Sequence, residues 1–450
     1  MNIDKTINYL FKNDSIQFES HVDEFTDEIF NEFDLLAEKL DLHKKIDDLI
    51  DGKVVNNSEN QAALHPKYRS ILNSSETPKN LIDAKVKVEE FYKNRCDSFK
   101  DVENSKINII NLGIGGSYEG PKLLLESLKN PIGFQNKDAN KINYEFITGS
   151  DPNEFEHKTK FLEPFNTIFV VSSKSFTTDE TLDSLKKALE WSKNTNNFIA
   201  ITANPNEVSK YGIKDVITFD KEIGGRYSVW SPITQFHLCG KQRASFIEGG
   251  HQADIDIQKN KEYLKFLKIL SYSDIWLNNV KGKHTRAIFC YDWNLRSLPN
   301  YFQQLEMESL GKHPNSKSKF KQTGQIVFGG FGPRAQHSYF QLLHQGSQEI
   351  CADIILTRED QKSLNYAQGM TQSKLLSKGQ ENLQKDEKIN GNVPVNLFTL
   401  NKLDSYTLGY LIASWEYRVF ITATMLEINP FDQFGVEAGK NSTIKFLEDN

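Results

Sequence analysis

Hydroxyl side chains gather in one short segment, residues 172–181 (SSKSFTTDET), where six serines and threonines follow the apolar run 167–171. The apolar run predicts a buried strand, and the polar residues after it predict a turn into a helix. Hydroxyl and backbone N–H groups at a helix N-terminus donate hydrogen bonds to phosphate oxygens, and the helix dipole favours the negative charge. The segment therefore indicates a phosphate site, with a capping box formed by Thr177 and Glu180 as the open alternative.

A glycine-rich turn, residues 111–121 (NLGIGGSYEGP), follows another apolar run. Its glycines allow the backbone to approach a ligand closely. If Gly113 and Gly115 began a dinucleotide-binding G-x-G-x-x-G motif, the third glycine position would hold Tyr118, and no acidic residue ends a strand about 20 residues later. A dinucleotide site is therefore disfavoured. The turn, with Ser117, suits a hydroxylated or anionic small molecule, and a plain tight turn is the alternative.

An arginine next to two glycines, in residues 224–234 (GGRYSVWSPIT), is the candidate for stabilising negative charge. Gly224 and Gly225 impose almost no steric limit on a ligand, so Arg226 can face an oxyanion that forms during a reaction. A fixed cation in that place contributes about 3 to 4 kcal/mol, as deletions in oxyanion holes indicate. The alternative is a surface arginine after a turn.

Carboxylates and histidines recur further along, in residues 304–312 (QLEMESLGK) and 336–346 (QHSYFQLLHQG). The first segment offers Glu306 and Glu308 as acid–base groups. The second places His337 and His344 one heptad apart, on one face of a predicted helix, without the HExxH spacing of a zinc site. We therefore expect no metal. Near the end, residues 431–440 (FDQFGVEAGK) supply Gln433 and Lys440, although a lysine near a chain end is usually only solvated.

The composition describes an ordinary globular protein of 450 residues, with 38 % hydrophobic and 25 % charged residues and a net charge of -6. No basic block favours nucleic acid as a partner. The four cysteines, at positions 96, 239, 290 and 351, are widely spaced and predict reduced thiols. The chain begins without a signal-peptide pattern and contains no run of about 18 apolar residues, so we expect a cytoplasmic protein without a membrane partner.

The elements that would position these residues follow from hydrophobic periodicity. Residues 1–100 show mainly helical spacing, and we expect a helical N-terminal layer. From residue 107, short apolar runs alternate with amphipathic stretches, which predicts a parallel sheet between helices. A second set follows a helical segment at 257–281, so we expect two tandem α/β sheets. Residues 378–394 predict a long loop, and residues 405–428 predict a buried helix.

Seven of these blocks, in this order, resemble the glucose-6-phosphate isomerase (phosphoglucose isomerase) family across nearly the whole chain. They are residues 57–69 (NSENQAALHPKYR), the GIGGS turn, SSKSFTTDET, GGRYSVWSPIT, QLEMESLGK, QHSYFQLLHQG and residues 428–440 (INPFDQFGVEAGK). The resemblance implies an α/β fold of two tandem sugar-isomerase (SIS-type) α/β/α sandwich domains with parallel sheets, an N-terminal helical layer and C-terminal helices. We place the two domains at residues 1–250 and 251–450.

The resemblance also implies roles, position by position. The phosphate contacts of the family match Ser173, Lys174, Ser175 and Thr178. The base that moves a proton between the first two carbons of the sugar matches Glu308, and the arginine that stabilises the enediolate matches Arg226. Ring opening matches His337 and Lys440. Further pocket positions match Gly116, Ser117, Glu180, Gly225 and Gln433. Family dimers place the histidine in the neighbouring site, so a homodimer with shared active sites is expected.

The expected reaction interconverts glucose 6-phosphate and fructose 6-phosphate and needs no cofactor, because a carboxylate, a cation and a ring opener suffice for this proton transfer. The chain departs from the family at Leu310, at Gln61 and at residues 333–335, and a family threonine is Ser175 here. The rival hypothesis is a non-catalytic sugar-phosphate-binding regulator. A nucleotide-dependent enzyme is disfavoured by the spacing at Tyr118.

Overall fold

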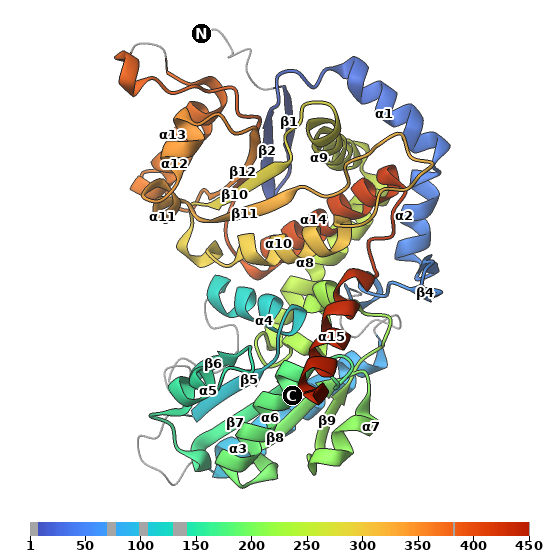
Figure 1. Cartoon of the computed structure of the whole chain (residues 1–450), viewed down its shortest axis with the longest axis vertical. Coiled ribbons are helices and arrows are strands. Elements are labelled where there is room, and N and C mark those ends of the chain that lie inside the picture. Colours follow the sequence, from blue (N-terminus) through green and yellow to red (C-terminus); the bar gives the residue numbers. More distant parts are fainter. Residues whose placement is uncertain (1–7, 70–77, 99–106, 129–141, 381–382, 450) are drawn as a thin grey trace.

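The apolar runs between residues 107 and 219 form one parallel sheet, in the lower lobe of the computed structural model in Figure 1. The structure describes residues 8–69, 78–98, 107–128, 142–380 and 383–449. In spatial order the strands of this first sheet are β6 (Ile142–Ile147), β5 (Ile107–Leu112), β7 (Thr167–Ser172), β8 (Phe198–Thr202) and β9 (Asp215–Thr218). β7 and β8 are buried along their whole length, and strands buried on both faces give continuous apolar runs.

The register of the first sheet aligns two of the predicted site segments. Leu112, the last residue of β5, lies opposite Val171 of β7, and both strands run in the same direction. The glycine-rich turn and the hydroxyl segment therefore leave the sheet at the same edge, which is where open parallel sheets bind ligands.

The second sheet lies in the upper lobe and is mixed. Its strands in spatial order are β1 (Tyr9–Lys12), β2 (Ile16–His21), β13 (Val395–Leu400), β12 (Ile350–Thr357), β10 (Thr285–Cys290) and β11 (Ile326–Phe331). The last four are parallel to one another, as expected. A small hairpin, β3 (Val54–Asn56) with β4 (Gln61–Ala62), stands apart from both sheets.

The expectation that residues 1–100 are helical was wrong for the first strands. β1 and β2 form an antiparallel hairpin, and β2 pairs antiparallel with β13. Alternate residues of β2 are buried, with Ile16 and Phe18 fully inside, which is the period of a strand that packs on one face. The N-terminal segment therefore belongs to the second sheet, and only after it does the chain become helical.

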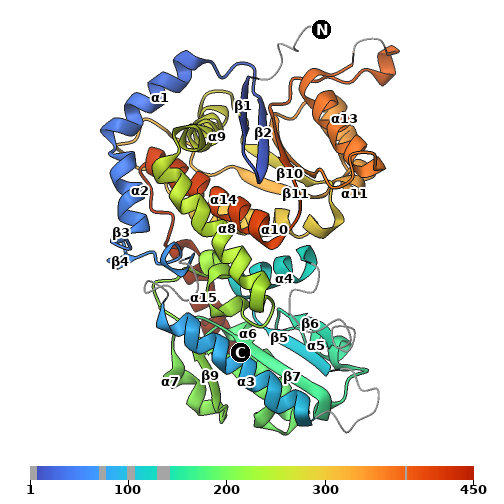
Figure 2. The same ribbon diagram turned by 180° about the vertical axis from the view of Figure 1, so that it is seen from behind.

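Helices cover both faces of each sheet. They are α1 (Asp27–Lys39), α2 (Leu42–Ile50), α3 (Lys79–Ser98), α4 (Gly116–Ser127), α5 (Pro152–Thr159), α6 (Asp179–Ser192), α7 (Pro205–Val208), α8 (Gly240–Lys259), α9 (Lys261–Asn279), α10 (Leu298–Leu310), α11 (Gly332–Gln336), α12 (Phe340–Gln345), α13 (Leu364–Lys378), α14 (Ser405–Leu426) and α15 (Glu437–Asp449). On the first sheet, α6 lies on one face and α3 on the other (Figures 1 and 2). The expected buried helix at 405–428 is α14, of which every residue except Tyr406 is buried.

One hydrophobic core runs through both lobes, from the inner face of the first sheet to that of the second. At its centre α8 and α14 approach closely, and glycines at the contact make this possible. A Cβ on Gly249 would lie only 1.9 Å from the carbonyl oxygen of Tyr406, and one on Gly409 only 2.1 Å from that of Phe246. The division at residues 1–250 and 251–450 stays a prediction. Two facts qualify it, because β1 and β2 lie in the second sheet and α8 continues through residue 250.

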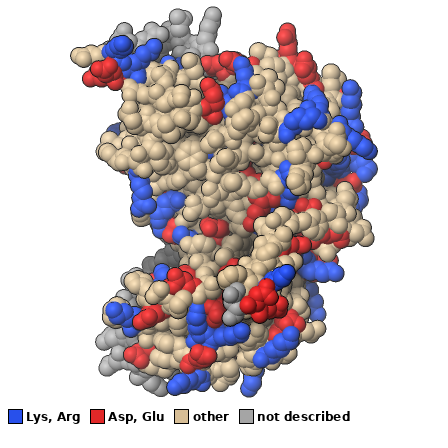
Figure 3. Space-filling view, viewed as in Figure 1, with Lys and Arg blue, Asp and Glu red and all other residues tan. Residues whose placement is uncertain are grey.

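The surface in Figure 3 interleaves acidic and basic side chains, and the molecule narrows between its two lobes. In the stretches of chain that the structure describes, every helix falls short of the length or apolarity that crossing a bilayer requires.

A buried charge cluster fastens the N-terminal segment to the α8–α14 pair. Arg69 donates to Glu416 on α14 at 2.6 Å and forms an ion pair with Asp254 on α8 at 3.1 Å. Trp230 donates its indole N–H to the other oxygen of Glu416 at 2.9 Å. Burial raises the pKa of Glu416 to about 7, even though Arg69 opposes the shift. Burial also lowers the pKa of His65, whose Nε2 lies 4.0 Å from Glu416, so this imidazole stays neutral.

The raised pKa of Glu416 predicts a measurable pH dependence of stability. The folded state keeps a proton on Glu416 between its unfolded pKa near 4.5 and its folded pKa of about 7, so this contribution is complete at low pH and disappears as the pH rises through 7. Between pH 5.5 and 8, the free energy of unfolding of the native protein should fall by about 2 kcal/mol more than that of Glu416→Gln. Urea titrations at both pH values measure the difference. Equal pH slopes would contradict the assignment.

Candidate active site

The hydroxyl segment forms a curved loop between β7 and the N-terminus of α6. Helix α6 begins after Thr178, whose Oγ1 lies 3.1 Å from Oγ of Ser173. Thr177 donates its hydroxyl to Ser175 at 2.8 Å. The N-cap is therefore Thr178 rather than Thr177, and the capping box that the sequence left open is not formed. The hydroxyl groups and the first N–H groups of α6 lie together at one helix end, as a phosphate site requires.

The glycine-rich turn brings three segments of the chain together. A Cβ on Gly113 would lie 2.9 Å from the carbonyl oxygen of Ser172, and one on Gly116 would lie 1.9 Å from that of Gly225. Gly115 has a positive φ of 59°, which favours glycine. Only glycine therefore allows the turn to fit between the hydroxyl segment and the segment that carries Arg226.

Arg226 is the centre of the site and is fully inside the protein, with 1 % of its side chain exposed. Its Nη1 donates to Oε2 of Glu308 at 3.1 Å and to Oε1 of Gln433 at 2.8 Å. Its Nε donates to Oγ of Ser309 at 2.7 Å, and its Nη2 donates to the carbonyl oxygens of Pro430 and Asp432. The alternative of a surface arginine was wrong, and the guanidinium is held in one orientation from every side.

Glu308 reaches toward solvent from α10, with 38 % of its side chain exposed. Gln304, one helical turn earlier, donates to its Oε1 at 3.0 Å, so each carboxylate oxygen has one donor. A carboxylate that is fixed on one side and open on the other can take a proton from a bound molecule.

Lys174 lies in the hydroxyl segment, near enough to Arg226 for the two charges to interact. It keeps a large exposed area, yet surrounding protein removes part of its hydration and lowers its pKa. The nearby carboxylates of Glu59 and Glu222 oppose the shift, and the Arg226 charge adds to it. Two cations and the end of α6 thus face the same region, which favours an anionic ligand.

The remaining predicted pocket residues lie on the same elements. The carbonyl oxygen of Ser117 accepts from Asn111 at 3.0 Å, which fixes the first turn of α4. The carbonyl oxygen of Ser175 accepts from Asn204 at 3.2 Å, and Glu180 lies half-buried in the first turn of α6.

His337 and Lys440 lie apart from this group. His337 is exposed at the C-terminal cap of α11 in the upper lobe, and Lys440 is exposed on α15. In this single chain, the described contacts of Arg226 and Glu308 include neither residue. The expectation that His337 and His344 share one helical face was wrong, because α11 and α12 are separate short helices. His344 instead lies 2.9 Å from Gln372 on α13, and burial lowers its pKa.

Sequence reasoning missed a set of contacts at Asp432, the residue before Gln433, which we call the Lys312–Asp432 clamp. Lys312 donates to Oδ1 of Asp432 at 2.8 Å and to its carbonyl oxygen, and Ser58 donates to Oδ2 at 2.6 Å. Burial alone would raise the pKa of Asp432, but these two hydrogen bonds outweigh it and lower the pKa. Burial also lowers the pKa of Lys312, against the effect of its partner. The available signal was an acidic residue directly before Gln433 and a lysine in the QLEMESLGK block.

The departures from the family pattern lie on three separate elements. Leu310 is buried at the end of α10, and residues 333–335 form most of α11, with Ala335 inside. Gln61 is half-buried on β4. Within the described residues, no group of three or more His, Cys, Asp or Glu side chains is placed to hold a metal ion.

Comparison with known proteins points to one family. The family model described as phosphoglucose isomerase matches residues 20–449. The glucose-6-phosphate isomerase of Legionella pneumophila strain Paris is 36 % identical over 427 residues, which cover 90 % of this chain and 84 % of the relative. That of Novosphingobium aromaticivorans is 32 % identical over 438 residues, which cover 91 % and 82 %.

The solved structures agree in fold. The crystal structure of a glucose-6-phosphate isomerase from Chlamydia trachomatis superposes with a TM-score of 0.81 at 22 % identity, covering 98 % of this chain and 89 % of that one. This likeness concerns the fold alone. Because the family model spans nearly the whole sequence and relatives above 30 % identity cover most of it, the chain belongs to the phosphoglucose isomerase family.

Proposed function

We propose that this protein interconverts glucose 6-phosphate and fructose 6-phosphate. The family supports this reaction, since the relatives above are named for it. The observation that carries the proposal is the pair formed by buried Arg226 and open Glu308, 3.1 Å apart, next to a loop of hydroxyl groups at the end of α6. A base, a fixed cation and an anion site are the three parts that this isomerisation requires.

The phosphate anchors the substrate. We assign its contacts to Ser173, Lys174, Ser175 and Thr178, where hydroxyls, an ammonium group and the N-terminus of α6 favour a dianion. Binding at this remote end orients the reacting carbons, so its free energy contributes to the chemical step. Gly116, Ser117, Glu180, Gly225 and Gln433 line the rest of the proposed pocket.

The proton moves between C1 and C2 of the open-chain sugar. Glu308 removes it from one carbon, the electron pair forms a cis-enediolate, and the same carboxylic acid returns the proton to the other carbon. Arg226 stabilises the negative charge on the enediolate oxygen. Its orientation is already fixed in the free protein, so little reorganisation is needed when the charge forms.

Ring opening is assigned to His337 of the partner subunit and to Lys440, in a homodimer with shared active sites. His337 lies exposed on the upper lobe and is not among the described contacts of Glu308 in its own chain, which supports donation to a second copy. The cytoplasmic location and the lack of nucleic-acid and membrane partners remain predictions from the sequence.

A regulator that binds sugar phosphate without converting it is the rival. A coupled assay that follows conversion of fructose 6-phosphate to glucose 6-phosphate decides between them. Binding without conversion by the native protein would overturn the proposed reaction and favour the regulator.

Glu308→Gln should lower turnover by about 10² to 10⁴, the range for loss of a general base, because the amide cannot accept the proton. Binding of the sugar phosphate should persist, since Gln keeps the size of the side chain and its hydrogen bond to Arg226. The coupled assay measures turnover, and calorimetry measures binding. Near-native turnover in this variant would remove Glu308 from its role.

The shared site predicts complementation between inactive variants. Glu308→Gln and His337→Ala should each be nearly inactive as homodimers. When equal amounts are co-expressed, half of the dimers are mixed and each carries one intact site, so about a quarter of native activity should return. Mixing Glu308→Gln with Arg226→Lys is the matched control, because both lesions affect groups of the same subunit and no activity should return. Absence of recovery in the first mixture would exclude a shared histidine.

A further inference from the structure

Helix α10 presents two opposite faces with different tasks. Successive residues turn by about 100°, so residues two apart lie on nearly opposite sides and residues four apart on the same side. Gln304 and Glu308 form the face toward the site and are hydrogen-bonded to each other. Phe302 and Glu306 form the face toward the core, and Glu306 is only 3 % exposed. The proposed mechanism uses the first face and leaves the buried carboxylate of the second unexplained.

Trp415 of α14 contacts the core face of α10 at two residues. Its indole ring stacks on Phe302, with ring centroids 3.9 Å apart and planes at 8°. Its Nε1–H donates to Oε1 of Glu306 at 2.6 Å. Arg286 of β10 forms a buried ion pair with the other oxygen of Glu306. The helix is therefore held across a full turn by one rigid side chain and one cation.

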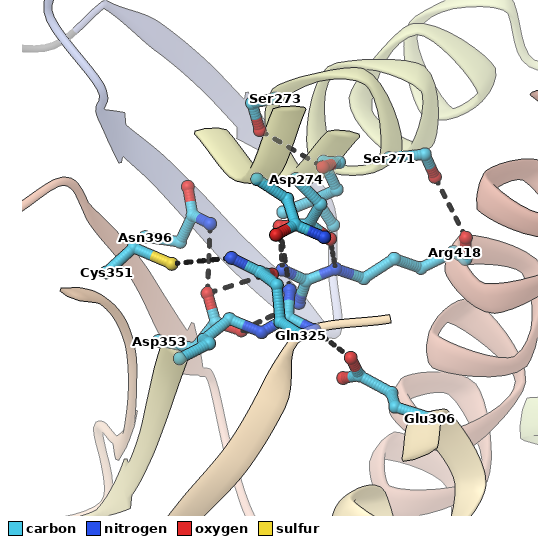
Figure 4. A network of polar contacts seen from close by, with 12 residues as sticks. Ser271, Ser273, Asp274, Glu306, Gln325, Cys351, Asp353, Asn396 and Arg418 are labelled. Atoms are coloured by element: carbon cyan, nitrogen blue, oxygen red, sulfur yellow. Dashed lines mark hydrogen bonds and ion pairs between the residues drawn. The ribbon is translucent and has the colours of Figure 1, made fainter. Parts of the chain in front are cut away.

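Glu306 belongs to a larger buried network, drawn in Figure 4, that joins α10 to α9, β10, β12 and α14. Arg286 also pairs with Asp274 at 2.7 Å, and Arg418 pairs with Asp274 at 2.7 Å and with Asp353 at 2.8 Å. Two guanidinium groups thus meet three carboxylates, of which Glu306 alone comes from α10. The second sheet and α9 thereby fix the orientation of the site helix.

Stability alone does not explain a charged group in this place. A buried ion pair is often no more stabilising than apolar side chains of the same volume, but its hydrogen bonds are directional. The carboxylate of Glu308 lies about 5 to 6 Å from the helix axis, so a rotation of α10 by about 10° would move it by about 1 Å. A displacement of this size can cost about 10²-fold in rate.

We propose that Glu306, held by Trp415 and Arg286, is a positioning residue that sets the rotation of α10 and thereby the placement of Glu308 against Arg226. The inference rests on the proposed isomerase reaction. Glu306 touches no substrate, and its effect passes through the helix to the carboxylate two residues later.

Glu306→Gln tests the inference. It leaves two arginines with two carboxylates, so the charges of the network become balanced and the variant is expected to fold. Its kcat should fall by about 10- to 100-fold, while KM for fructose 6-phosphate changes by less than about 2-fold, since only the base is displaced. Asp353→Asn is the matched control: it removes one carboxylate from the same network, but on β12, and should lower the unfolding temperature without changing kcat by more than about 2-fold.

Trp415→Phe keeps an aromatic ring to stack on Phe302 and removes the hydrogen bond to Glu306, although it also shortens the ring that contacts Phe398 and Arg418. Its kcat should also fall. In the variant that carries both Glu306→Gln and Trp415→Phe, kcat should fall by less than the product of the two single effects, because both substitutions break the same contact. If Glu306→Gln does not fold, Trp415→Phe decides. A kcat that stays native in the folded variants, or that falls as far in Asp353→Asn, overturns the inference.

Crystal structures separate this inference from the proposed function. Failure of the native protein to isomerise fructose 6-phosphate would refute the proposed function. The role of Glu306 in positioning Glu308 would then be judged from the distance between Glu308 and Arg226 alone. In Glu306→Gln that distance should exceed the native 3.1 Å, and in Asp353→Asn it should not. An unchanged distance in Glu306→Gln, together with native kcat where the protein is active, leaves Glu306 no role in positioning.

Discussion

The buried guanidinium of Arg226 is the constraint on which the rest of the site depends. A cation removed from water is costly unless ions and hydrogen bonds replace its hydration. Here the replacements come from α10, through Glu308 and Ser309, and from residues 430–433, through two carbonyl oxygens and Gln433. The chain can satisfy Arg226 only by bringing both segments to it. The group that would stabilise the enediolate is therefore the same group that assembles the pocket, and the Lys312–Asp432 clamp holds the second segment in place.

Close backbone contacts complete the assembly. Gly116 lies against the backbone of Gly225, and Gly249 and Gly409 allow α8 and α14 to cross with almost no space between them. The lobe that carries the hydroxyl loop meets the lobe that carries Glu308 where α10 packs against α4 and against residues 225–230. A phosphate held at the end of α6 and a proton removed by α10 lie in different lobes, so the proposed reaction needs the lobes in a fixed relation. The continuous core through the junction provides it.

Much of the fold could be predicted from hydrophobic runs, and the exceptions have physical reasons. β5, β7 and β8 are buried on both faces, so their sequences are apolar throughout and bounded by turns. The hairpin β1–β2 was missed because it packs on one face only, and its alternation, Ile16 and Phe18 against polar neighbours, spans just a few residues beside a long helical pattern. No strand was predicted between the loop at 378–394 and the helix at 405–428, where β13 lies, because one short run after a polar loop gives only a weak pattern.

The sequence by itself determined the chemical groups and their local setting: hydroxyls before a helix, glycines after a strand, an arginine beside glycines, and two carboxylates in residues 304–312. Local spacing can establish these because each depends on a few neighbouring residues. Only the tertiary structure decided which groups meet. It placed Gln433 on Arg226 across 207 residues, separated His337 from both, and paired Lys312 with Asp432. Such pairings depend on how two sheets and a shared core bring distant segments together. No local pattern specifies a contact between residues so far apart in the sequence.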